Sequence, residues 1–301
     1  MKVGKRKFAG DPHAATPTNT HMLRALSVFV AIVSLHLAFG EAQTAPPAAE
    51  TTIAEDSAAE TELLTAANNS RKLAGVPPLR VDESLREAAR AHARLMVASD
   101  RLEHQLPGEP SLIQRIAQAG AVKDTLKVDR VGENIAYASC PSGANDALMH
   151  SAPHRKNLLD SGFNIAGIAA IWSKGKLYVA QDFAHEVPSY SAKQTGQLVG
   201  RAIHEMREQA GIPDLQEVRP PNLDQAACSL AKENHPNAHL LATAYQNRRI
   251  ITYTQSRPEI VPEAAMRLLR DPAVRQFAVG SCYARNAEYP TGIYWVAILL
   301  D

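Results

Sequence analysis

Two histidines and one glutamate stand out in this sequence, because imidazole and carboxylate groups bind metals or move protons near neutral pH. His104 follows a predicted helix, Glu133 follows a glycine, and His154 follows a proline. Side chains at the boundaries of helices and strands can point into a shared cleft rather than into the core. We therefore expect His104, Glu133 and His154 to line one cavity.

The residues by themselves also allow purely structural roles. Each histidine could hydrogen-bond backbone at a helix end, and Glu133 could brace its loop through backbone N–H groups. The three residues lie far apart in the sequence, without the short spacing of a chelating motif. His92 falls on the apolar stripe of its helix, where a core histidine with satisfied hydrogen bonds is expected.

The composition excludes several classes of function. The 301 residues carry a formal net charge of +1, which gives no electrostatic field for steering nucleic acid. The Gly-x-Ser-x-Gly, His-Glu-x-x-His and phosphate-loop motifs do not occur, which argues against the common hydrolase and nucleotide chemistries. The length allows two compact domains.

Residues 1–42 have the pattern of a secretory signal peptide. A basic segment precedes the apolar run 25–39, and Gly40 and Ala42 occupy the small-residue positions of a cleavage site. The run is shorter than the roughly 20 residues of a spanning helix, so we expect no membrane span after cleavage. The alternative is an uncleaved anchor, and either Met1 or Met22 can be the start. We expect the protein to be secreted or to reside in the periplasm or cell envelope.

Residues 43–58 are predicted to be an acidic linker rich in Ala, Thr and Pro. In residues 59–186 helical patterns come first and two strand-like runs, 165–172 and 177–183, come last, with a hairpin loop between them. A polar loop over 123–130 precedes a short strand over 131–136. This order predicts an α+β fold with a small antiparallel sheet.

Residues 187–301 are predicted to be a degenerate repeat of the first domain. Arg71-x-x-Ala-Gly-Val-Pro-x-Leu recurs from Arg207, and Leu85-x-x-Ala-Ala-x-x-x-Ala recurs from Leu223. The second copy contains no Gly-Glu-Asn, and we place Pro272-Ala273 where the first copy has Pro153-His154. The polar residues are therefore predicted to be dispensable for the fold.

Three cysteines leave at least one thiol unpaired in a monomer. Cys228 is expected on the first helix of the second copy and Cys282 on its final strand. Secretion favours a disulfide between them, and two buried free thiols are the alternative.

The first copy resembles the CAP superfamily of cysteine-rich secretory, antigen 5 and pathogenesis-related proteins, and most of all its bacterial SCP-like extracellular branch. The motifs that carry the resemblance are Asn68-x-x-Arg71, Gly75-Val76-Pro77-Pro78-Leu79, Ala89-x-x-His92-Ala93, His104, Arg115-Ile116-x-x-x-Gly120, Gly132-Glu133-Asn134-Ile135-Ala136, Ser151-x-x-His154-Arg155-x-Asn157-Leu158-Leu159 and Tyr178-x-x-Gln181-Asp182-Phe183. It implies an α-β-α sandwich whose cavity is lined by two histidines and two acidic residues, and in some members holds a divalent metal.

Carried over by motif, His104, Glu133 and His154 fill three of the four family positions. Ser151 matches the fourth and cannot replace a carboxylate charge. The resemblance implies zinc or another divalent metal as the possible cofactor, because two histidines and one glutamate can form an open zinc site.

Three functions follow from these predictions, in order of preference. The first is a binding module whose cavity takes a small lipid, peptide or glycan. The second is an envelope protein that docks through the second copy. The third is a metal-assisted hydrolase or peptidase with Glu133 as general base. We thus favour a binding protein over an enzyme.

Overall fold

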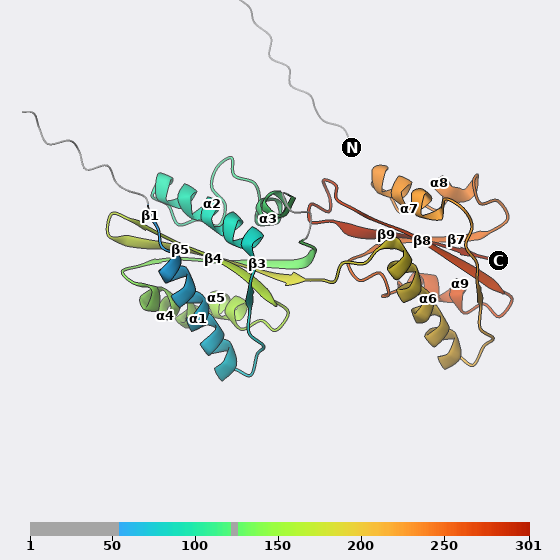
Figure 1. The fold of residues 1–301 in the computed structure, drawn as a ribbon, viewed down its shortest axis with the longest axis horizontal. Coiled ribbons are helices and arrows are strands. Elements are labelled where there is room, and N and C mark those ends of the chain that lie inside the picture. Colours follow the sequence, from blue (N-terminus) through green and yellow to red (C-terminus); the bar gives the residue numbers. More distant parts are fainter. Residues whose placement is uncertain (1–53, 122–125) are drawn as a thin grey trace, which may run out of the picture. The chain divides into compact units, whose positions relative to one another are not determined.

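The computed structural model describes residues 54–121 and 126–301 (Figure 1). In each half of the described chain, helices cover both faces of a mainly antiparallel β-sheet. This arrangement confirms the predicted α+β class and, for the first half, the α-β-α sandwich. The predicted signal peptide, residues 1–42, lies outside the described residues.

The first half contains a five-stranded sheet in the order β1-β4-β5-β3, with β2 paired to β4. Its strands are Ala54–Glu55 (β1), Arg80–Val81 (β2), Val128–Ala138 (β3), Ile165–Ser173 (β4) and Lys176–Glu186 (β5). Its helices are Ser57–Leu73 (α1), Glu83–Ser99 (α2), Leu112–Ala121 (α3), Pro141–His150 (α4) and Ala152–Leu158 (α5). Helices α2 and α3 cover one face of the sheet, and α1, α4 and α5 cover the other (Figure 1).

The fold begins earlier than the predicted end of the linker at residue 58. Asp56 caps α1 by accepting a hydrogen bond from the backbone N–H of Ala59 at 2.9 Å. Its own N–H donates to the carbonyl of Ala170 in β4. Residues 54–58 therefore belong to the domain, and the rest of the predicted linker lies outside the described residues.

Strand β3 is longer than predicted at both ends. It pairs with β5 from Val128 to Ala138, so residues 128–130 are strand rather than loop. Asp129 and Arg130 are exposed on a strand at the edge of the sheet. Charged residues protect such edges from pairing with other chains. Because they interrupt the alternation of apolar and polar residues, the hydrophobic pattern did not predict this part of the strand.

The second half contains a four-stranded sheet in the order β6-β8-β9-β7. Its strands are Gln216–Glu217 (β6), Arg249–Gln255 (β7), Gln276–Ala284 (β8) and Ile293–Leu300 (β9). Its helices are Ala192–Gln209 (α6), Leu223–Lys232 (α7), His239–Ala242 (α8) and Glu263–Leu269 (α9). A disulfide joins Cys228 in α7 to Cys282 in β8, with the two Cα atoms 5.0 Å apart.

The two sheets have the same core connectivity. In each half a two-residue strand pairs in parallel with the first strand of the final hairpin, β2 with β4 and β6 with β8. The remaining strand, β3 or β7, pairs antiparallel with the second strand of that hairpin. Strand β1 is the element without a counterpart among the described residues of the second half.

A buried arginine closes each half in the same way. Both Arg71 and Arg207 are fully buried and donate to backbone carbonyls at the end of a short helix. Three acceptors correspond, Pro77, Leu158 and Asp160 for the first arginine and Pro213, Leu269 and Asp271 for the second. Arg71 also donates to the carbonyl of Phe163, whereas Nη2 of Arg207 has no partner among the described residues. These bonds satisfy carbonyls that would otherwise be buried without partners.

The arginine contacts correct one sequence alignment. When the two halves are aligned on these contacts, Leu158 is matched with Leu269 and His154 with Ala265. The prediction that Pro272-Ala273 stands in this place is wrong, because Pro272 follows α9 instead of lying within it.

Candidate functional site

The structure brings His104, Glu133 and His154 together. Nδ1 of His104 lies 2.8 Å from Oε1 of Glu133. Because an ionised carboxylate only accepts hydrogen bonds, Nδ1 carries the hydrogen and Nε2 is left as the free ring nitrogen. The centroids of the His104 and His154 rings are 6.3 Å apart. The side chain of His104 is 57% exposed, whereas that of Glu133 is 4% exposed.

The residues flanking Glu133 attach β3 to the helix that carries His154. Gly132 packs against the ring of Phe163, where a Cβ atom would lie 2.8 Å from Cζ. Asn134 donates to the carbonyl of His154 at 3.0 Å, and Asn157 donates to the carbonyl of Glu133 at 3.1 Å. The Gly-Glu-Asn segment therefore has a bracing role through its backbone and Asn134, in addition to what the Glu133 side chain does.

Glu133 also belongs to a set of buried charged groups that the sequence did not identify as a unit. We call His92, Glu109, Arg115, Glu133 and Asp182 the buried polar cluster. The guanidinium of Arg115 forms ion pairs with Glu133 and, at 2.9 Å, with Glu109. One cation thus pairs with two buried carboxylates. Charged groups in a site without water need such a partner of opposite charge.

His92 is part of this cluster rather than an ordinary core histidine. Its Nδ1 lies 2.8 Å from Oε1 of Glu109. Its Nε2 is buried without a hydrogen-bond partner among the described residues and lies 3.8 Å from Oε2 of Glu133. The expectation that His92 is fully satisfied is therefore wrong.

Asp182 is the most deeply buried acid of the cluster. It is 0% exposed, and neither carboxyl oxygen has a hydrogen-bond partner among the described residues. Burial, followed by the charge of nearby Glu133, raises the pKa of Asp182 well above its usual value. Because side chains alternate between the two faces of a strand, the sequence could have placed Asp182 on a core face. Nothing in the neighbouring residues, which have an ordinary strand pattern, marked it as part of a charged cluster.

His154 differs from His104 in its surroundings. It is partly buried at the start of α5, and this burial, with a smaller contribution from His104, lowers the pKa of His154. Ser151 is the N-cap of the same helix, and its side chain makes no capping hydrogen bond. Among the described residues, its hydroxyl makes no hydrogen bond to His104, Glu133 or His154.

The geometry gives no support to the predicted metal site. Among the described residues, no group of three or more His, Cys, Asp or Glu side chains is arranged to hold a metal ion. Both oxygens of Glu133 are already engaged, one by His104 and the other by Arg115. Each oxygen of Glu133 thus has a polar partner, and the predicted role of Glu133 as a general base stays a prediction.

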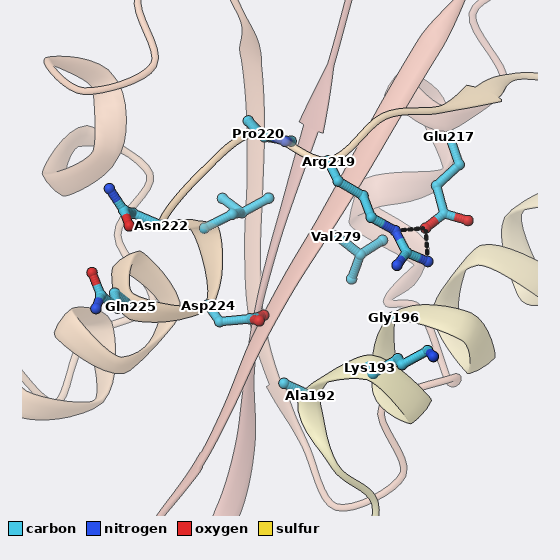
Figure 2. Close-up of a pocket in the computed structure, with 11 residues that line it drawn as sticks. Ala192, Lys193, Gly196, Glu217, Arg219, Pro220, Asn222, Asp224, Gln225 and Val279 are labelled. Carbon is cyan, nitrogen blue, oxygen red and sulfur yellow. Dashed lines mark hydrogen bonds and ion pairs between the residues drawn. The ribbon is translucent and has the colours of Figure 1, made fainter.

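The pockets best defined in the described residues lie elsewhere, and none of them contains the three predicted residues. One pocket of about 390 Å³ opens in the second half, between the N-terminal ends of α6 and α7 (Figure 2). His104, Glu133 and His154 therefore form a surface site that is defined by their contacts. The cavity predicted around these three residues is not among the best-defined pockets of the described residues.

Comparison with known proteins identifies the first half. Residues 64–183 match the sequence model of the CAP family, the Cysteine-rich secretory protein family. Residues 64–183 form a CAP domain. The match covers the helices and strands that carry His104, Glu133 and His154, and it confirms the resemblance seen in the sequence.

The chain is also similar in sequence to a curated bacterial protein. The chain is 31% identical over 126 residues to "Uncharacterized protein YkwD" of Bacillus subtilis (strain 168), a stretch that covers 42% of this chain and 47% of the relative. This chain thus spans about half the length of that curated relative.

Two solved structures are among those to which the chain has some similarity. An extracellular protein containing a SCP domain from Bacillus anthracis is 25% identical with a TM-score of 0.38, covering 42% of this chain and 40% of the other. An outer surface protein from Borrelia burgdorferi is 16% identical with a TM-score of 0.41, covering 46% and 99%. None of the helices in the described ranges has the length and apolar character needed to cross a membrane.

Proposed function

We propose that the CAP domain is the ligand-binding module of a secreted or cell-envelope protein, and that its ligand contacts the exposed edge formed by His104 and His154. The signal-peptide pattern of residues 1–42 supports this location. Of the lipid, peptide and glycan ligands expected from the sequence, hydroxyl- or amide-bearing ones suit two imidazoles best. Such groups can hydrogen-bond to either tautomer of a histidine.

The observation that carries this proposal is the fixed orientation of an exposed imidazole. Glu133 holds Nδ1 of His104, and Arg115 in turn holds Glu133 from the buried side. A ligand that binds to Nε2 then meets a ring whose rotamer is already set, so less conformational entropy is lost on binding.

The test uses the full chain with its histidine rings labelled with ¹⁵N, and follows the ring signals by NMR. The probes are chitopentaose, a mixture of randomised N-acetylated pentapeptides, and palmitate. Binding should shift the signals of His104 and His154 and should be lost in His104→Gln. His150→Gln is the matched control, because His150 is also exposed but bonds only to the carbonyl of Asp146. Ring signals that none of the three probes moves would contradict the proposal.

The contact between His104 and Glu133 also favours a second candidate function. A carboxylate that orients Nδ1 of a histidine leaves Nε2 able to take a proton, as in hydrolytic dyads and triads. In this version His104 is the general base for a water molecule and Glu133 is its orienting group. A peptidase assay on the same pentapeptide mixture should then lose most activity in both His104→Gln and Glu133→Gln. No hydrolysis by the native chain would eliminate this candidate and leave ligand binding in place.

We also propose that residues 187–301 are a degenerate copy of the CAP domain that no longer carries the buried polar cluster. Gly167 packs against the backbone at Leu85, and Gly280 packs against the backbone at Leu223. With these contacts as the reference, the strand registers match Glu133 with Thr252 and Asp182 with Ala297. The same reference matches His92 with the buried Leu230. These three positions of the cluster therefore carry no charged side chain in the second half, and the ligand site above belongs to the first half alone.

A further inference from the structure

The outer edge of β8 is the starting point, because its backbone groups can be assigned a direction. Gln276 and Asp301 exchange both of their backbone hydrogen bonds, at 3.1 and 3.0 Å. In an antiparallel pair, successive residues alternate between facing the partner and facing away. The backbone N–H and C=O groups of Ala278 and Gly280 therefore point toward β9. Those of Val279 point to the outer edge of the sheet.

Both of these Val279 groups lack a hydrogen-bond partner among the described residues. Strand β6 ends at Glu217, and its last bond to this edge is donated by the N–H of Val218 to the carbonyl of Phe277. The next residue that could donate is Pro220, which has no N–H. In the CAP domain the matching carbonyl, that of Ala166, accepts from the N–H of Asp82 at 3.0 Å.

A pocket has opened over this edge. It has a volume of about 390 Å³, within the range of roughly 300–1,000 Å³ that is typical of ligand sites. Val279 of β8 and Gly196 of α6 both line it (Figure 2). A Cβ atom on Gly196 would come no closer than 3.9 Å to its nearest neighbour, the carbonyl oxygen of Val279.

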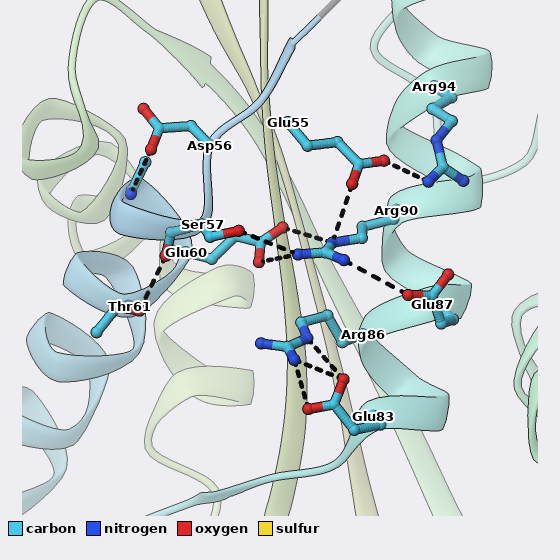
Figure 3. A network of polar contacts seen from close by, with 11 residues as sticks. Glu55, Asp56, Ser57, Glu60, Thr61, Glu83, Arg86, Glu87, Arg90 and Arg94 are labelled. Carbon is cyan, nitrogen blue, oxygen red and sulfur yellow. Dashed lines mark hydrogen bonds and ion pairs between the residues drawn. The ribbon is translucent and has the colours of Figure 1, made fainter.

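In the CAP domain the matching place holds a smaller pocket of about 100 Å³, which Glu60 and Ala166 help to line. Counting from the two buried arginines, Gly196 corresponds to Glu60, which is buried and bonded through both oxygens to Arg90 (Figure 3). Counting from the two leucines that contact Gly167 and Gly280, Arg90 corresponds to Cys228. Neither member of this ion pair is present in the second half, where Cys228 is instead tied to β8 by the disulfide.

The polar groups around the pocket narrow the kind of ligand. Lys193 and Arg219 are balanced by Glu217 and Asp224, so the lining favours neither a strongly anionic nor a strongly cationic ligand. The N–H of Ser281, next along the edge, is already bonded to Asp224 at 2.9 Å. The edge is therefore open at Val279 but blocked one step further, which leaves room for a single pair of backbone hydrogen bonds.

We propose that this pocket binds an extended peptide segment, one residue of which pairs with Val279 in the antiparallel manner. A peptide main chain offers an N–H for the Val279 carbonyl and a C=O for its N–H, with the spacing of a strand. The site is separate from the edge formed by His104 and His154, and it does not depend on the function proposed for that edge.

The experiment measures amide chemical shifts of the full ¹⁵N-labelled chain during titration with the randomised N-acetylated pentapeptides. The amide of Val279 should shift in the native chain. Gly196→Glu introduces the side chain that narrows the matching pocket of the CAP domain and should weaken the apparent affinity at least about tenfold. Gly196→Ala is the matched control, because it adds no group long enough to close the pocket. Both substitutions favour the helix over glycine, and urea unfolding of the two variants checks that each remains folded.

Three outcomes would overturn the proposal. One is a chemical shift of the Val279 amide that does not change when the peptides are added. Another is an equal affinity in the native chain and Gly196→Glu, which would put the peptides at a different site. The last is a Val279 shift with chitopentaose but not with the peptides, which would assign the pocket to glycans.

Discussion

Asp182 lies directly opposite Glu133 in the paired strands β5 and β3, so two acids share one side of the sheet in a site closed to water. Residues that face each other across antiparallel strands bring their side chains close together. Arg115 supplies one positive charge, and it already pairs with Glu133 and Glu109. A third ionised carboxyl group here would have no compensating cation, which favours a proton on Asp182.

Asp182→Asn should raise the free energy of unfolding at pH 7 by about 1 kcal/mol. Burial and the charge of Glu133 raise the pKa of Asp182, so above about pH 4 the unfolded chain releases a proton that the folded chain keeps. The free energy of unfolding of the native chain therefore falls as the pH rises above this value, whereas that of the asparagine variant has no such dependence. Urea unfolding across this pH range should show a gap between the two that widens with pH. Asp146→Asn, at an exposed position, is the control. A gap that narrows with rising pH would contradict a proton on Asp182.

Arg115→Met should destabilise the domain by about 3–5 kcal/mol, because it leaves Glu109 and Glu133 buried without a cation. The matched control is Arg130→Met, which removes an ion pair with Asp160 that is half exposed and worth less than about 1 kcal/mol. Thermal unfolding compares the two variants. Similar small losses would mean that the buried carboxylates find other partners.

The site could be predicted from the sequence only as far as its motifs reach. His104, Glu133 and His154 were expected together because their motifs resemble those of one family, and the structure brings them into contact. Sequence spacing alone would not have joined residues so far apart. The fold class followed from the order of helical and strand patterns, which depends on local periodicity.

The buried polar cluster could not be predicted in the same way. Arg115 lies on a helix and Asp182 within a strand, and nothing in either segment signals that the two side chains converge on Glu133. Their meeting depends on the pairing register of β3 with β5 and on how α3 packs over it. The unpaired backbone groups of Val279 could not be predicted for the same reason, because they depend on which residue of β6 is the last to pair with β8.

His104→Gln should raise the pKa of His154 toward its ordinary value. Burial lowers the pKa of His154 most, and the neighbouring charge of His104 lowers it further, so removing that charge restores only part of the difference. An NMR titration of the His154 ring measures the change. His150→Gln should leave the His154 titration as it is in the native chain. An unchanged pKa in His104→Gln would show that the two rings do not interact.

Replacing Cys228 and Cys282 together by serine should lower the free energy of unfolding by about 2–4 kcal/mol. The disulfide closes a loop with a sequence separation of 54, and without it the unfolded chain gains the entropy of that open loop. Denaturant unfolding, followed by amide signals of the second half, measures the loss. Cys140→Ser is the control, because Cys140 is the free cysteine. Equal stability of the double variant and the native chain would show that the disulfide contributes nothing.

Gly280→Ala should destabilise the second half by about 1–3 kcal/mol, and Gly167→Ala should do the same in the CAP domain. In each case the new Cβ would meet backbone of the facing helix, at Leu223 or Leu85, and backbone cannot move aside as the end of a side chain can. Gly196→Ala is the matched control. Its Cβ has space, so the better helix propensity of alanine should raise stability by up to about 1 kcal/mol. Thermal unfolding of the three variants tests the correspondence between the halves. If Gly280→Ala were tolerated as well as Gly196→Ala, β8 would not approach α7 as β4 approaches α2, and the matching of Glu133 with Thr252 would lose its reference point.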